Sequence, residues 1–97
     1  MYSAFEKSFE AYYQKVMQAN CTLSDWKDFR LLHQKMPRIS HSGIKDGKIP
    51  GIEIRKYWKY CDQFANAAKH VAARLPLDDI AKDPVLEFAY HELFHVE

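Results

Sequence analysis

The chain has 97 residues, of which 47% are apolar and 14% aromatic, and its formal net charge is +1. This composition excludes an intrinsically disordered chain and fits one globular domain over residues 1–97. No window holds the roughly 18 uncharged apolar residues of a membrane-spanning helix, and residues 1–10 lack the apolar core of a secretion signal. We therefore expect a cytoplasmic protein, in which Cys21 and Cys61 are free thiols packed as small hydrophobic side chains.

Four segments carry apolar residues at helical spacing, which predicts an all-α fold, a compact bundle of about four helices. The first helix is expected over residues 3–19. The second begins at Thr22 or Ser24, either of which can cap it, and ends before Pro37. A long helix is expected over residues 52–75, and Asp83-Pro84 is a cap and first-turn pair that begins a last helix ending near His95.

The long helix is expected to bury one apolar stripe against the rest of the bundle. Its small residues would allow another helix to approach closely. The residues assigned to this stripe are Ile54, Tyr57, Trp58, Cys61, Phe64, Ala65, Ala68, Val71, Ala72 and Leu75.

Residues 37–51 have no helical period and contain all three glycines and two of the four prolines. They predict one long exposed loop, with a short hairpin around Asp46-Gly47. Long loops in small domains are often functional. This loop is also basic, and it lies in a basic part of the chain: residues 27–59 hold nine Lys or Arg against three Asp or Glu, whereas residues 76–97 hold one against six. This uneven charge suggests surfaces for a charged partner.

Residues 91–95, His-Glu-Leu-Phe-His, match the HExxH pattern of zinc hydrolases. On a helix, His91 and His95 lie one turn apart and can bind one zinc ion, while Glu92 can act as the base toward a metal-bound water. Only two residues follow His95, so a third ligand has to come from elsewhere, from Glu87, Glu97, His33, His41 or His70. A terminal helix frays, so ordinary surface histidines are the favoured interpretation and no cofactor is expected. A zinc-dependent hydrolase is kept as an alternative.

Nucleic-acid binding is a second alternative. Basic residues from Lys27 to Lys59 are interleaved with Trp26, Tyr57, Trp58 and Tyr60, a mixture typical of phosphate contact with base stacking. Most of these aromatic residues fall on the apolar stripes, however, and the sequence pI of 7.8 is low for a dedicated nucleic-acid binder. Core packing is therefore their expected role.

Two stretches, YSAFEKSFEAYYQKV (2–16) and EIRKYWKYCDQFANAAKHVA (53–72), resemble the anti-RecBCD accessory proteins (Abc type) of lambdoid phages. The resemblance implies a host-takeover protein in the host cytoplasm that binds the RecC subunit of the RecBCD exonuclease. Binding would let phage DNA ends survive and recombine, with DNA itself contacted weakly or indirectly. It supplies no site residues. From the charge pattern alone, the expected contact surface is the basic loop and its flanks: Arg38, His41, Lys45, Lys48, Arg55, Lys56 and Lys59.

Overall fold

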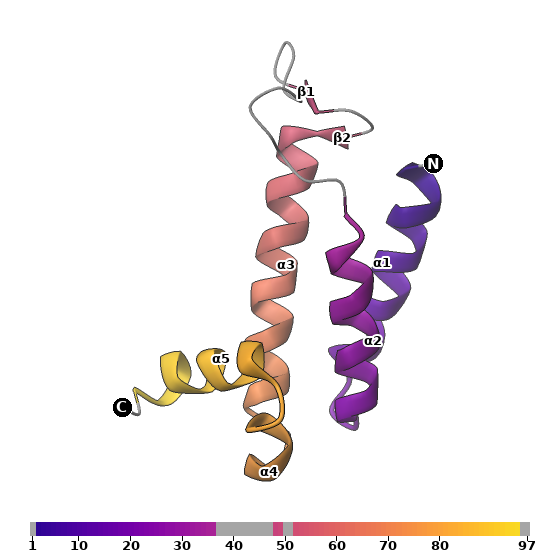
Figure 1. Cartoon of the computed structure of the whole chain (residues 1–97). Coiled ribbons are helices and arrows are strands. Elements are labelled where there is room, and N and C mark those ends of the chain that lie inside the picture. The colour runs from indigo at the N-terminus through magenta and orange to yellow at the C-terminus, as the bar shows by residue number, and fades with distance from the viewer. Residues whose placement is uncertain (1, 37–47, 50–51, 96–97) are drawn as a thin grey trace.

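The computed structural model describes residues 2–36, 48–49 and 52–95. The described part consists of helices, the turns between them and one hairpin with two strands of two residues each (Figure 1). Its helices are α1 (Tyr2–Val16), α2 (Leu23–Gln34), α3 (Ile54–Ala72), the single turn α4 (Leu77–Ile80) and α5 (Pro84–Phe94). The predicted all-α class is confirmed, with four longer helices and one extra turn. Among the described residues, no helix is both long enough and apolar enough to cross a membrane.

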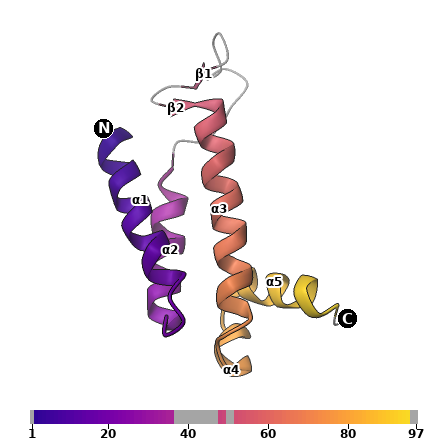
Figure 2. The ribbon, with the colours of Figure 1, turned by 180° about the vertical axis from the view of Figure 1, so that it is seen from behind.

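Helices α1 and α2 form a hairpin that packs along one side of α3 (Figures 1 and 2). The sequence left two candidates for the cap of α2, and Thr22 is the one that caps it. Its Oγ1 accepts a hydrogen bond from the Asp25 backbone N–H at 3.2 Å, and the Asp25 carboxylate accepts one from the Thr22 N–H at 3.0 Å. This reciprocal capping box satisfies two N–H groups that a helix start leaves unpaired. The Thr22 N–H also lowers the pKa of Asp25.

A cluster of aromatic side chains joins α1, α2 and α3. The Phe9 ring centroid lies 4.6 Å from that of Tyr60 and 5.0 Å from that of Phe29, and Trp26 stacks on Phe64 at 5.1 Å. Offset and tilted ring pairs at these distances add to the free energy gained by burying the rings. The core of this half of the molecule is therefore aromatic.

Helix α5 leaves the C-terminal part of α3 sideways, on the side away from α1 and α2 (Figures 1 and 2). It packs on α3, and its buried side chains are Leu86 and Ala89. Asp83 caps α5 as predicted, because its Oδ1 accepts hydrogen bonds from the Val85 and Leu86 N–H groups at 2.9 and 3.2 Å.

The described residues include one short β-hairpin just before α3. Strands β1 (Lys48–Ile49) and β2 (Ile52–Glu53) pair antiparallel, with Lys48 opposite Glu53. The predicted hairpin around Asp46-Gly47 lies outside the described residues. Since residues 52 and 53 are extended, α3 begins two residues later than expected.

Two described members of the stripe predicted for this helix are exposed. Trp58 and Ala65 are exposed, whereas Tyr60 and Ala67, which the stripe omitted, are buried. At about 100° per residue, positions 58 and 65 fall on one line of the helix surface, well away from the line through Phe64 and Val71. The predicted stripe therefore included a line of the helix that faces solvent and left out two buried positions.

Candidate functional site

The predicted basic surface is only partly within the described residues. Arg38, His41 and Lys45 lie outside them, and for Lys48 only the backbone, in β1, is described. Arg55, Lys56 and Lys59 are exposed on the first two turns of α3. The described part of this surface is therefore one end of one helix.

Two of these three cations face acidic residues of the same chain. Lys56 Nζ lies 3.7 Å from a Glu6 carboxylate oxygen on α1. Lys59 lines a groove of about 300 Å³ between α1 and α3, together with Glu6 and Glu10. An exposed ion pair of this kind contributes little to stability, but it offsets positive charge that a partner could otherwise use. Lys56 and Lys59 are therefore weaker candidates for partner binding than their position in the sequence indicates.

Arg55 lies one helical turn before Trp58 on α3, and both side chains are exposed. The side chain of Trp58 is 55% exposed, whereas Trp26, the other tryptophan, is fully buried. Tyr57, which is half-buried, contacts Trp58 edge-on with ring centroids 5.5 Å apart. We call Arg55, Tyr57 and Trp58 the Trp58 patch. Its charged neighbour one turn further along α3 is Asp62, also exposed. Trp58 was expected in the core, because its spacing in the sequence places it among the apolar residues of this helix.

The HExxH residues all lie exposed at the far end of α5. The helix ends at Phe94, and His95 follows it in the left-handed region at φ 51°. His91 and His95 therefore do not share a regular helical face, contrary to expectation. Of the proposed third ligands, His33 is half-buried and stacks on Phe64 at 4.0 Å, His70 is half-buried, and His41 and Glu97 lie outside the described residues. No group of three or more metal-ligating side chains occurs within the described ranges.

Both cysteines lie where burial disfavours the thiolate. Cys21 is buried and Cys61 is half-buried, and neither forms a disulfide. Burial raises the pKa of each thiol above its usual value. Because the thiolate is the nucleophile, this environment disfavours a reactive cysteine at either position.

Comparison with family models, with curated proteins and with solved structures found no match to this chain.

Proposed function

We propose that this chain works by binding another protein and that the Trp58 patch is the centre of its binding surface. The observation that carries the proposal is the exposure of Trp58, which is 55% exposed whereas Trp26, the other tryptophan, is fully buried. Tryptophan and arginine are enriched among the few residues that dominate the free energy of binding at protein interfaces. An exposed indole with an arginine one turn away is therefore a suitable anchor for a partner.

The partner that we propose is the RecBCD exonuclease of a bacterial host, contacted through RecC. Its identity rests on the resemblance of residues 2–16 and 53–72 to phage anti-RecBCD proteins. The Trp58 patch lies within the second of these stretches, which α3 covers almost completely. The function would be to modify RecBCD so that phage DNA ends persist and recombine. Acting at an interface, such a protein would use contact area and charge complementarity.

A second candidate function is binding of single-stranded nucleic acid. The exposure of Trp58 favours it, because bases stack on exposed aromatic rings and a neighbouring arginine can contact phosphate. The affinity for nucleic acid should fall strongly as the salt concentration rises, because phosphate contacts release counterions. This dependence distinguishes the second candidate from the first.

The first test compares the chain with a Trp58→Ala variant for binding to purified RecBCD and for inhibition of its degradation of linear DNA. We expect the variant to bind at least about thirtyfold more weakly, the effect of losing about 2 kcal/mol at a central interface residue. An Arg55→Glu variant should slow association, most clearly at low salt. The same proteins are titrated with a single-stranded oligonucleotide at two salt concentrations.

The matched control is Phe88→Ala, which removes an aromatic side chain that is 67% exposed on α5, far from the Trp58 patch. It should bind as the parent does. Equal affinity of the Trp58 and Phe88 variants for RecBCD would place the interface elsewhere. If the parent chain does not bind RecBCD at all, this partner is wrong, and oligonucleotide binding lost in Trp58→Ala would then support the second candidate.

A further inference from the structure

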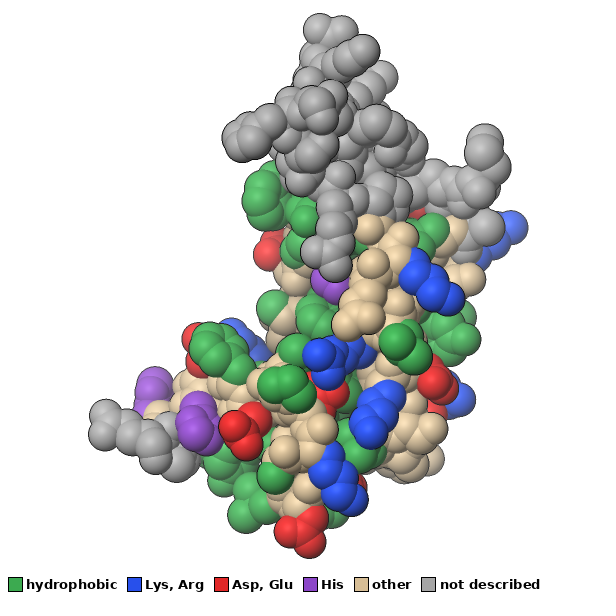
Figure 3. All heavy atoms as spheres, in the orientation of Figure 1, with side chains coloured by type: hydrophobic (Ala, Val, Ile, Leu, Met, Phe, Trp, Pro, Cys, Tyr) green, Lys and Arg blue, Asp and Glu red, His purple; other side chains and the backbone are tan. Residues whose placement is uncertain are grey.

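A cationic cleft lies between α2 and the junction of α4 with α5, separate from the Trp58 patch. Its volume is about 400 Å³, and the residues that line it are Lys27, Arg30, Leu31, Gln34, Lys82 and Asp83. Lys82 comes from the acidic C-terminal part of the sequence, so the charge pattern along the chain gave no sign of this site. Lys and Arg side chains gather on this face, over α2 and the nearby α4–α5 junction (Figure 3).

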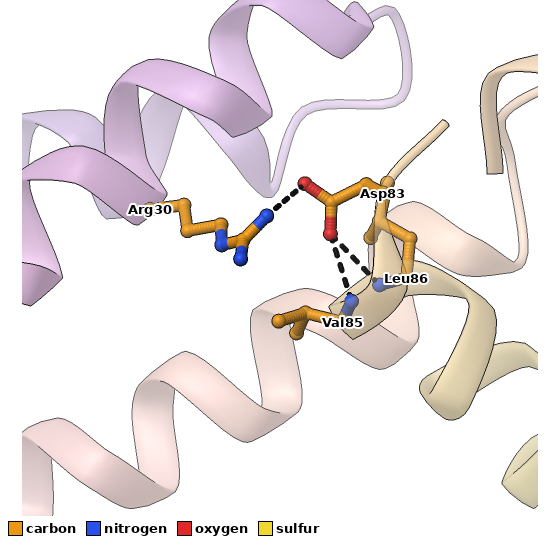
Figure 4. A network of polar contacts seen from close by, with 4 residues as sticks. All are labelled: Arg30, Asp83, Val85 and Leu86. Carbon is orange, nitrogen blue, oxygen red and sulfur yellow. Dashed lines mark hydrogen bonds and ion pairs between the residues drawn. The ribbon is translucent and has the colours of Figure 1, made fainter. Parts of the chain in front are cut away.

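The one carboxylate that lines the cleft is already fully engaged. Asp83 is 1% exposed; its Oδ1 accepts the two N–H groups at the start of α5, and its Oδ2 accepts Arg30 Nη1 at 2.8 Å (Figure 4). A guanidinium has five N–H donors in a fork, so a single bond to Asp83 leaves Arg30 with further donors. Arg30 is thus held in place by Asp83 and can still donate to a ligand.

We infer that this cleft binds a phosphate monoester group. Three cations from two separate elements surround the space, and the buried Asp83 offsets only one of their charges. Asp79 lies 3.8 Å from Lys82 Nζ, a loose and mostly exposed pair that a ligand can displace. A phosphate monoester carries about −1.5 to −2 charges near pH 7 and three strong acceptor oxygens, so it fits a space lined by three cationic side chains better than a carboxylate does.

The cleft also contains an apolar contact for the body of the ligand. Leu31 follows Arg30 on α2. Its side chain is exposed and lines the same cleft. A phosphate attached to an apolar group would cover this side chain while its oxygens reach the cations. An aryl phosphate should therefore bind more tightly than inorganic phosphate, because covering apolar surface adds favourable free energy.

The experiment follows the backbone amide signals of the isotope-labelled chain by NMR while phenyl phosphate, inorganic phosphate or benzoate is added at constant ionic strength. We expect saturable shifts confined to residues 27–34 and 82–86, with phenyl phosphate tightest and benzoate weakest. A Lys27→Ala, Lys82→Ala variant should bind phenyl phosphate at least about tenfold more weakly, the effect of one lost charge-assisted hydrogen bond. Arg30 is left intact because its removal would strand the buried Asp83.

A Lys7→Ala, Lys69→Ala variant is the control, with the same net charge and two exposed lysines that do not line the cleft. It should bind as the parent does, and both variants should have the parent's far-UV circular dichroism. Equal weakening in the two variants, shifts spread over all lysine-bearing surfaces, or no saturation with phenyl phosphate would overturn the inference. Tightest binding of benzoate would show a carboxylate site and would overturn it as well. Because the site does not include the Trp58 patch, these outcomes are independent of RecBCD binding.

Discussion

The buried carboxylate of Asp83 both caps a helix and forms an ion pair. It caps α5 with Oδ1 and holds Arg30 of α2 with Oδ2, so it ties together helices that are 53 residues apart in the sequence (Figure 4). The cap was predictable, since Asp before Pro is a common way to begin a helix. The ion pair was not, because no local pattern relates position 30 to position 83. The same reasoning applies to Trp58, whose exposure depends on where the neighbouring helices lie and not on its own spacing.

We predict that Asp83→Ala lowers the free energy of unfolding by about 2–4 kcal/mol, through a lost N-cap and a broken ion pair that is only partly screened by solvent. Asp83→Asn should cost less, because asparagine caps helices as well as aspartate does and only the charge opposite Arg30 is lost. Urea unfolding measures both. The control is Asp78→Ala, an exposed aspartate on α4. A cost for Asp83→Ala no larger than for Asp78→Ala would contradict the structural role given to Asp83.

Small side chains make up much of the buried surface of α3. Ala67, Ala68 and Ala72 are buried on this helix, which packs against α5 on one side and against α1 and α2 on the other. The existence and approximate ends of the four longer helices followed from apolar spacing, capping residues and proline, which are local signals. These signals did not predict which alanines are buried. Alanine fits any face of a helix, so its burial depends on where the neighbouring helices lie. The predicted stripe accordingly included Ala65 and omitted Ala67.

We expect Ala67→Leu to destabilise the fold by about 1–3 kcal/mol, because extra methylenes in a packed contact force the helices apart. Ala65→Leu should change stability by no more than about 0.5 kcal/mol, because the side chain is exposed and leucine is nearly as good a helix former as alanine. The pair differs only in position, so thermal unfolding of the two variants tests the structure directly. The reverse ranking would support the stripe deduced from the sequence.

Across the whole molecule, α3 is the element that the two halves share. Its N-terminal part completes the aromatic cluster with α1 and α2, and its C-terminal part carries α5. The Arg30–Asp83 pair adds a direct link between the halves. A single domain over residues 1–97 is what the sequence predicts, and these shared contacts give that prediction a physical basis, because each half buries part of its surface against α3.

We therefore predict that the described helices unfold in one cooperative transition. In a Trp58→Phe variant, Trp26 is the remaining tryptophan, and its buried ring on Phe64 reports on the aromatic cluster alone. Its fluorescence should change at the same urea concentration as the far-UV circular dichroism, to which α5 contributes, because α3 cannot lose one set of contacts and keep the other. Asp83→Ala, introduced into this variant, should shift both transitions equally. A helical signal that is partly lost before the fluorescence of Trp26 changes would show instead that α5 unfolds by itself, and the chain would then consist of a stable three-helix unit with a weakly attached C-terminal helix.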